Sequence, residues 1–233
     1  MPAYRLTSSC IWNSFQNSNK KHIIITGNRG AGKSTLLHHL FPNPLPGITT
    51  WAVPKSAVYL KENGTDNVTQ VGVYDASLEG YENKMVLCSD GFASFGIRAL
   101  NNALLSDSEW ISIDEVGYLE SQCSDYLNMI SQIMDKKHVL VIVRKQNLPH
   151  IKELSERDDV FLMDLDTPFG NMGCVIMASG LGKRFGENKL MAMFHGNPLI
   201  SYILDATSDI FKKRIVVTRH ESVANLCKER NID

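Results

Sequence analysis

The chain has 233 residues, a formal net charge of −1 and 43% hydrophobic residues. A net charge this close to zero argues against a basic surface for nucleic acid or an anionic membrane. The longest apolar runs, such as residues 139–143, are far shorter than the roughly 20 residues that span a bilayer. We therefore expect a globular protein, long enough for one large domain or one and a half ordinary ones, with neither nucleic acid nor membrane as a partner.

The amino-terminal residues lack the continuous apolar core and small-residue cleavage site of a secretory signal. Residues 1–20 are polar and Ser/Asn-rich after a few apolar positions, which predicts a loosely held leader without chemistry. The five cysteines are widely spaced and form no C-x-x-C pair, which predicts reduced thiols and a cytoplasmic location.

Residues 22–40 combine a β-branched strand, a glycine-rich turn and an apolar stretch of helical character. Residues 27–34 fit the phosphate-loop pattern G-x-x-x-x-G-K-[ST] in its proper strand–turn–helix context. Glycines let successive backbone N–H groups point at phosphate oxygens, and the positive end of the following helix adds to the attraction. The predicted nucleotide-binding residues are Gly27, Asn28, Arg29, Gly30, Ala31, Gly32, Lys33, Ser34 and Thr35.

Two residues of this loop have specific predicted roles. Lys33 is expected to reach the β- and γ-phosphates as a catalytic cation, and the Ser34 hydroxyl is expected to bind Mg²⁺. The alternative is a glycine-rich turn that only connects a strand to a helix.

After the first helix, the proline-rich residues 41–47 end it abruptly, and we expect a loop near the phosphates. Residues 57–60 and 68–74 have strand character and flank an Asn-Gly turn signal, which predicts a hairpin. Residues 85–88 predict a short strand, and residues 92–105 have the apolar spacing of a helix.

Residues 109–117 form an apolar strand that ends in the adjacent acids Asp114 and Glu115. In a phosphate-loop protein, an acid at this strand end holds Mg²⁺ and its neighbour orients or deprotonates the attacking water. We assign Asp114 to the metal and Glu115 to the water. A solvated acidic turn is the alternative, which the upstream phosphate loop makes less favourable.

The rest of this region alternates between the apolar spacing of helices and that of buried strands. Residues 126–134 and 148–157 predict helices, and residues 138–143 and 160–165 predict buried strands. Such alternation predicts an α/β fold with a doubly wound parallel sheet over residues 21–170.

Residues 22–166 resemble the small nucleoside-triphosphatase family of P-loop proteins. The resemblance rests on IIITGNRGAGKST, on the Thr49-Thr50 region and on IDEVGYLE at 113–120. It implies Mg²⁺-dependent hydrolysis of ATP, GTP or CTP with loose base selectivity. Asp164-Leu165-Asp166 stands where family members have an Asn-Arg-Asp type element. Arg29, Arg98 and Arg144 are all candidates for a charge-stabilising arginine, with Arg29 preferred.

A turn-rich stretch near residue 170 predicts a domain boundary. Over residues 171–233 we expect a strand at 174–178, a helix at 198–211, a strand at 214–218 and a helix from 221, which together form a βαβ unit. Between the first strand and helix lies a second glycine-rich loop with three cations. Its small residues admit a triphosphate, which Arg184 and Lys189 can neutralise.

This second stretch resembles the nucleotidyltransferases of molybdenum cofactor synthesis, whose opening motif is similar to ASGLGKRFGENK at 178–189 followed by GNPL at 196–199. The resemblance implies a Rossmann-like nucleotidyltransferase domain, nearer the cytidylyl branch. It implies as partners a molybdopterin or a molybdenum hydroxylase apoenzyme. The loop residues it implies are Ala178, Ser179, Gly180, Arg184 and Lys189.

A complete transferase domain needs a metal-binding acid on a later strand, and about 60 residues after the boundary are less than half an ordinary domain. Asp205 and Asp209 lie on the predicted helix, where a solvated face is the simpler explanation. We therefore expect an incomplete second domain, a fragment of a longer two-domain protein.

Two further functions stay open at this point. One is a nucleotide-gated regulatory or delivery module for molybdoenzyme maturation with slow turnover. The other is a dinucleotide-binding turn at residues 180–186, although the following strand does not end in the acid that such a site needs.

Overall fold

A computed structural model describes residues 8–78, 84–88, 90–168, 173–182, 185–186, 188–208, 210–211 and 213–233. The chain divides into two compact units, Met1–Asp166 and Thr167–Asp233. Of the predicted site residues, Arg184 lies outside the described residues, and so does Asp209. No helix in the described ranges is long and apolar enough to cross a membrane.

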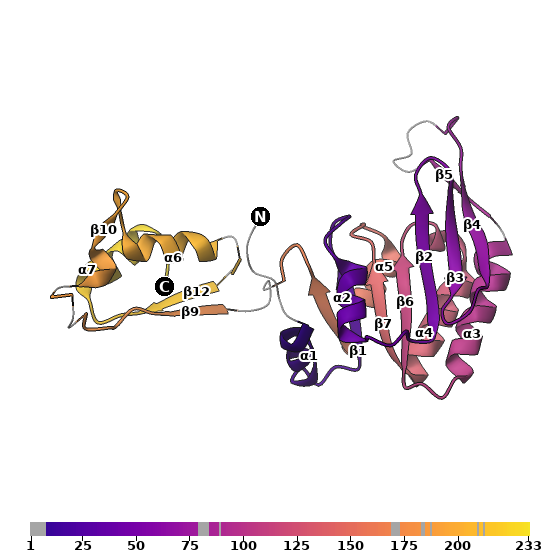
Figure 1. Ribbon diagram of the computed structural model, residues 1–233, viewed down its shortest axis with the longest axis horizontal. Coiled ribbons are helices and arrows are strands. Elements are labelled where there is room, and N and C mark those ends of the chain that lie inside the picture. The colour runs from indigo at the N-terminus through magenta and orange to yellow at the C-terminus, as the bar shows by residue number, and fades with distance from the viewer. Residues whose placement is uncertain are drawn as a thin grey trace. The chain divides into compact units, whose positions relative to one another are not determined.

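The first unit is built on an eight-stranded sheet in the order β5-β4-β3-β2-β6-β7-β1-β8 (Figure 1). Strands β2, β6, β7, β1 and β8 are parallel, and β2 to β5 form an antiparallel extension. The strands are β1 (His22–Thr26), β2 (Gly47–Val53), β3 (Ala57–Glu62), β4 (Val68–Tyr74), β5 (Met85–Leu87), β6 (Trp110–Val116), β7 (His138–Val143) and β8 (Val160–Asp164).

Helices cover both faces of this sheet. They are α1 (Ser8–Gln16), α2 (Lys33–Leu40), the π-helix η1 (Gly91–Gly96), α3 (Ile97–Leu105), the 3₁₀-helix η2 (Glu120–Gln122), α4 (Ser124–Lys136) and α5 (Pro149–Ser155). Neighbouring residues of one strand enter different cores, because side chains alternate across a sheet. Ile24 joins the core under α3 and α4, whereas Ile23 and Ile25 join the core under α1 and α2. The predicted α/β fold is confirmed.

Most predicted elements of this unit are confirmed. The Asn-Gly signal joins β3 and β4 in an antiparallel hairpin, and the predicted strand before Asp114 is β6. The amphipathic helix is α4, which buries Tyr126, Met129 and Ile130 among others.

The expectation of a loosely held leader is wrong for residues 8–16. These residues form α1, whose Ile11 and Phe15 are buried. Trp12 lies on the same side of the helix and packs edge-on against Phe41, with ring centroids 5.6 Å apart. Three large apolar side chains spaced over one helical turn outweigh the weak helix propensity of the surrounding Ser and Asn residues.

The proline-rich stretch ends the first helix at Leu40 as expected, but the loop that follows is short, because the strand β2, which the sequence analysis did not predict, begins at Gly47. Gly47 has φ +132, and a Cβ atom on it would lie 1.9 Å from the carbonyl oxygen of Ser112. Glycine is therefore required for β2 to approach β6 this closely. The Asn63 amide then joins the strands: it accepts from Thr49 Oγ1 at 2.8 Å and donates to Ser112 Oγ at 3.1 Å.

The second unit contains the predicted βαβ arrangement. Strands β9 (Gly173–Met177) and β12 (Lys213–Val217) are parallel, and α6 (Leu199–Ser208) connects them. Helix α7 (Glu221–Glu229) packs on the same core through Val223 and Cys227. The short elements are η3 (Lys189–Met191), β10 (Met193–Phe194) and β11 (Asn197–Pro198). The opposite face of β9 and β12 exposes Val175, Met177, Ile215 and Val217.

Candidate nucleotide site

The phosphate loop connects the end of β1 to the start of α2. Gly30 and Gly32 have φ values of +80 and +93, a left-handed conformation that side chains disfavour. Gly32 is the N-cap of α2, and no side chain caps this helix. The first N–H groups of the helix are therefore available to an anion.

Lys33 folds back over this loop. Its Nζ atom donates to the carbonyl oxygens of Gly27 at 3.0 Å and Asn28 at 3.2 Å. The same nitrogen lies 3.7 Å from Glu115 Oε1, and the Lys33 side chain is only 10% exposed. A nearly buried cation thus lies between the loop backbone and the acidic end of β6, where the sequence predicts the phosphates.

Asp114 and Ser34, the two predicted metal ligands, line the same cavity. Burial raises the pKa of Asp114 to about 6, although the nearby Ser34 hydroxyl opposes the shift. A buried carboxylate gains most from a cation, because neither water nor an ion pair neutralises it fully.

These two oxygen atoms fit Mg²⁺. No group of three or more His, Cys, Asp or Glu side chains placed to hold a metal occurs in the described part of the chain. Mg²⁺ in nucleotide sites needs none, because one or two protein oxygens suffice when phosphates and water complete the octahedron. The Ser34 hydroxyl and the Asp114 carboxylate would supply the protein part.

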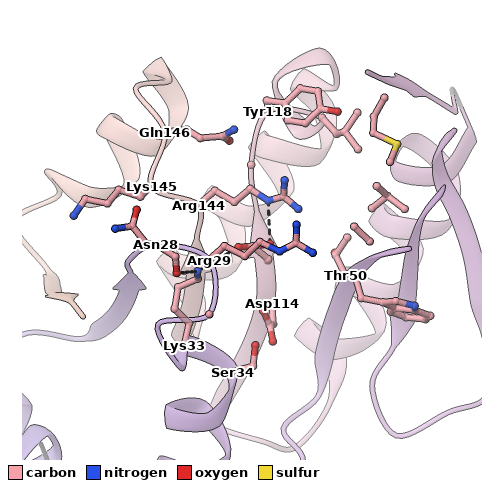
Figure 2. A pocket seen from close by; sticks show the side chains of 18 of the residues that line it. Asn28, Arg29, Lys33, Ser34, Thr50, Asp114, Tyr118, Arg144, Lys145 and Gln146 are labelled. Atoms are coloured by element: carbon pink, nitrogen blue, oxygen red, sulfur yellow. Dashed lines mark hydrogen bonds and ion pairs between the residues drawn. The ribbon is translucent and has the colours of Figure 1, made fainter. Parts of the chain in front are cut away.

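Glu115 lies between two cations. Arg144 Nε donates to its Oε2 atom at 3.0 Å, and Lys33 faces its Oε1 atom. Arg144 follows β7, and Figure 2 shows Arg144 and Arg29 extending into the same cavity. Arg98 instead lies over the Phe95 ring at 5.1 Å and is not among the residues that line this cavity. The structure thus adds Arg144 to the preferred Arg29.

A second ion-pair group fixes the loop to β8. Lys145 Nζ lies 3.0 Å from an oxygen of Asp164 and 2.8 Å from one of Asp166. Asp166 also accepts the Asn28 N–H at 2.9 Å. Residues 164–166, which stand in place of the Asn-Arg-Asp type element, therefore hold the start of the phosphate loop in place through Asp166.

Glu120 is a buried acid beside the site to which the sequence analysis gave no role. It is 3% exposed and accepts the Gly117 N–H at 2.8 Å. Burial raises its pKa to about 7. The signal available in the sequence was its place three residues after a glycine at a strand end, which permits such a side-chain cap of a turn.

A cavity of about 990 Å³ lies at this end of the sheet (Figure 2). All predicted loop residues except Ala31 line it, together with Asp114 and Glu115. Its further wall comes from the antiparallel extension and the turn after β6: Thr50, Trp51, Ala52, Pro54, Lys55, Val58, Tyr74, Lys84, Met85, Gly117, Tyr118, Leu119 and Glu120.

The second glycine-rich loop is described only in part. Ala178 is buried, and Ser179 Oγ donates to the Val217 carbonyl oxygen at 3.0 Å. The Gly180 carbonyl oxygen lies 2.9 Å from His220 Nε2, and Lys189 begins η3 with an exposed side chain. These contacts tie the start of the loop to the end of β12.

The expected solvated helix face of the second unit is confirmed at Asp205. Its carboxylate is 70% exposed and pairs with Arg230 at 2.6 Å. This exposed ion pair gives no indication of a metal site.

Two family models match separate parts of the chain. Residues 56–168 match the NTPase family model, a stretch that includes Asp114 and Glu115 but begins after the phosphate loop. Residues 174–233 match the model of the MobA-like NTP transferase domain. No curated protein matches the chain.

Among solved structures, THEP1 from the hyperthermophile Aquifex aeolicus is similar, with a TM-score of 0.54 and 20% identity over 65% of this chain and 93% of that chain. A human cancer-related nucleoside triphosphatase has a TM-score of 0.48 and 20% identity over 62% of this chain and 88% of that chain. The likeness to THEP1 establishes a shared fold. Two successive stretches of the chain, residues 56–168 and 174–233, thus match two different family models, that of the NTPase and that of the MobA-like NTP transferase domain.

Proposed function

We propose that the first unit binds a nucleoside triphosphate with Mg²⁺ and hydrolyses its terminal phosphoanhydride. The observation that carries this proposal is the convergence of Lys33, Ser34, Asp114 and Glu115 on one cavity beside the phosphate loop. The NTPase family match supports it independently.

The proposed mechanism is in-line attack of water on the γ-phosphorus. Lys33 and the loop N–H groups bind the β- and γ-phosphates, and Ser34 and Asp114 hold Mg²⁺, which when bound neutralises phosphate charge. Glu115 orients the water and accepts its proton. The new oxygen–phosphorus bond forms as the bond to the bridging β–γ oxygen breaks, and a nucleoside diphosphate leaves.

Arg144 is proposed as a positioning residue. Its contact with Glu115 Oε2 leaves Oε1 facing Lys33, so the carboxylate is held from both sides. Arg29 projects into the cavity from the loop and can approach the transferred phosphoryl group (Figure 2).

The test is phosphate release from ATP, GTP and CTP with Mg²⁺. Lys33→Ala should abolish triphosphate binding and reduce release by at least about a hundredfold, because a charge-stabilising donor is lost. Lys152→Ala, a surface lysine that is 67% exposed, is the matched control and should behave as wild type. Release that persists in Lys33→Ala would refute the site. Tight binding without turnover in wild type would favour the regulatory or delivery module.

For the second unit we propose a nucleotidyltransferase segment, with a molybdopterin as the acceptor class. The match to the MobA-like domain supports it. Pyrophosphate release from CTP or GTP that requires a pterin acceptor, and that falls in Lys189→Ala and Arg184→Ala, is expected if this segment is active. Pyrophosphate release unchanged in both variants would exclude the loop. All five cysteines are free thiols, which supports the proposed cytoplasmic location.

A further inference from the structure

The cavity extends beyond the acids, on the side away from the phosphate loop. In the sheet order β2-β6-β7-β1, β2 is next to β6, the strand that carries Asp114 and Glu115. Strand β1, which leads into the phosphate loop, lies on the other side of β6, two strands away from it. Thr49 pairs with Asp114, so Trp51 lies two residues further along β2. Ser34 and Asp114 set the γ-phosphate end of a bound triphosphate at the acids. In a triphosphate bound in this way, the wall formed by β2 would lie past the γ-phosphate.

Trp51 offers a rigid aromatic surface in this wall. It is the cross-strand partner of Tyr59, and the two rings are stacked with centroids 5.6 Å apart and an interplanar angle of 25°. The Trp51 side chain nevertheless stays 40% exposed and lines the cavity. An aromatic ring supported from behind and open toward a cavity is suited to stack on a planar ligand.

Cationic groups line the same cavity. Arg29 and Arg144 extend into it (Figure 2), and Lys55 and Lys84 are also among its lining residues. Within the described ranges Arg29 makes no ion pair. Thr50 Oγ1 is buried in the cavity wall without a hydrogen-bond partner among the described residues. The combination of a planar apolar surface with Arg29, and with Arg144, which also pairs with Glu115, matches a ligand with an aromatic ring and a phosphate.

We propose that this part of the cavity binds a nucleoside monophosphate as a phosphoryl acceptor, with its base on Trp51 and its phosphate between Arg29 and Arg144. This inference rests on the proposed function, because it requires a triphosphate bound through Lys33 and the loop. An oxygen of the acceptor phosphate attacks the γ-phosphorus. The new oxygen–phosphorus bond forms as the bond to the bridging β–γ oxygen breaks, so that two nucleoside diphosphates result. Water takes the same place when no acceptor is bound.

The experiment uses the full chain with ATP labelled in the γ-phosphate, Mg²⁺, and AMP, GMP, CMP or UMP. We expect label in the diphosphate of at least one of these acceptors and less labelled inorganic phosphate. Trp51→Ala should lower the ratio of transfer to hydrolysis by about tenfold, because base stacking on an aromatic ring is lost. Trp51→Phe keeps a ring and should stay near wild type. Val53→Ala is the matched control, since this exposed residue of β2 does not line the cavity.

The outcomes separate the two proposals. Labelled inorganic phosphate without label in any diphosphate would overturn the acceptor site and leave the hydrolase standing. Transfer that is equal in Trp51→Ala and wild type would overturn the place assigned to the base. If neither inorganic phosphate nor a diphosphate carries label, the proposed function fails, and the acceptor site with it.

Discussion

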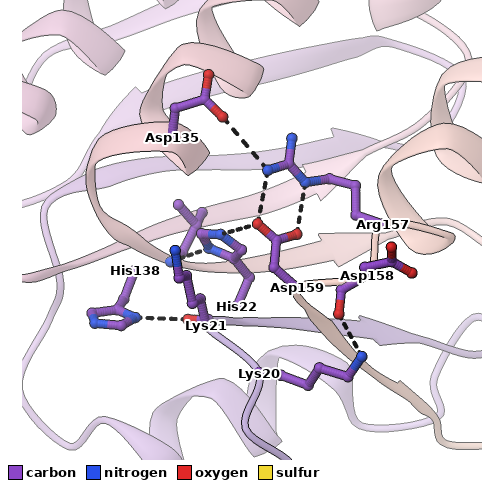
Figure 3. A network of polar contacts seen from close by, with 9 residues as sticks. Lys20, Lys21, His22, Asp135, His138, Arg157, Asp158 and Asp159 are labelled. Atoms are coloured by element: carbon purple, nitrogen blue, oxygen red, sulfur yellow. Dashed lines mark hydrogen bonds and ion pairs between the residues drawn. The ribbon is translucent and has the colours of Figure 1, made fainter.

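The amino-terminal ends of the parallel strands (the amino edge of the sheet) and their carboxyl-terminal ends (the carboxyl edge) both carry charged side chains. The two sets of charges are arranged differently. At the amino edge, Arg157 donates to both oxygens of Asp159 at 2.9 Å and pairs with Asp135 at 3.5 Å (Figure 3). The buried His22 lies 3.3 Å from the same Asp159 carboxylate. These hydrogen bonds, with Arg157 foremost, lower the pKa of Asp159 to about 2. At the amino edge, the charges of Arg157, Asp159 and Asp135 are therefore paired with one another.

At the carboxyl edge the charges surround a cavity instead. Asp114 is buried, and burial raises its pKa to about 6. Lys33 lies 3.7 Å from Glu115, longer than the Arg157 contacts with Asp159. Incomplete neutralisation costs stability and is characteristic of sites that bind charged ligands. The comparison predicts that changes at the carboxyl edge alter activity and that changes at the amino edge alter stability.

The largest expected effect is that of Glu115→Gln. Loss of the group that accepts the proton should reduce hydrolysis by at least about a hundredfold, while triphosphate binding through Lys33 is preserved. Turnover and binding of a non-hydrolysable ATP analogue, measured on the same preparation, check both parts. Wild-type turnover in this variant would remove Glu115 from the mechanism.

Glu120→Gln should increase stability at alkaline pH. Its pKa is about 7 in the fold against 4.5 for an ordinary glutamate, so folding resists its ionisation and stability falls as pH rises from 4.5 to 7. The glutamine, which can still accept the Gly117 N–H, should raise the free energy of unfolding by up to about 3 kcal/mol at pH 8 and by about 1 kcal/mol or less at pH 5. Urea titrations at both pH values measure this, with the exposed Glu153→Gln as control. A pH-independent difference would contradict the buried neutral carboxyl.

The smallest expected effect is at the amino edge. Asp159 has a pKa of about 2 in the fold against an ordinary 3.8, so its stabilisation is present above pH 4 and is lost as pH falls toward 2. Because the side chain is 30% exposed, Asp159→Asn should cost only about 1 kcal/mol at neutral pH. Urea titrations should show that the difference in free energy of unfolding between wild type and Asp159→Asn is smaller at pH 3 than at pH 7. Asp158→Asn is the neighbouring control. Altered turnover in Asp159→Asn would contradict the expectation that changes at the amino edge affect stability and not activity.

The sequence identified the parts of this site that depend on local pattern. The phosphate loop and the strand before Asp114 are continuous motifs, and both lie in the predicted elements. Strand β2 was missed because its place depends on the close approach of Gly47 to Ser112 and on Asn63, which are tertiary contacts. Helix α1 was missed because its stability comes from packing rather than propensity.

Side chains that reach the site from other strands were harder to predict. Arg144 was one of three candidate arginines, and Arg29 was preferred to it. The contact of Arg144 with Glu115 joins the ends of β7 and β6, which local pattern does not reveal. The pairing of Lys145 with Asp164 and Asp166 likewise joins β7 to β8. A basic pair directly after a buried parallel strand was the available signal, since such strand ends meet at one edge of the sheet.

We propose that the carboxyl edge binds the triphosphate and that the amino edge maintains the fold. The most direct test measures urea unfolding midpoints with and without a non-hydrolysable ATP analogue and Mg²⁺, for wild type, Lys33→Ala and Asp159→Asn. All three tryptophans (Trp12, Trp51 and Trp110) lie in the first unit, so their fluorescence reports on it. At a hundredfold excess over the dissociation constant, ligand should stabilise wild type by about 2.7 kcal/mol. We predict that Asp159→Asn keeps this gain from a lower baseline and that Lys33→Ala loses it. A full gain in Lys33→Ala, or its loss in Asp159→Asn, would contradict the account.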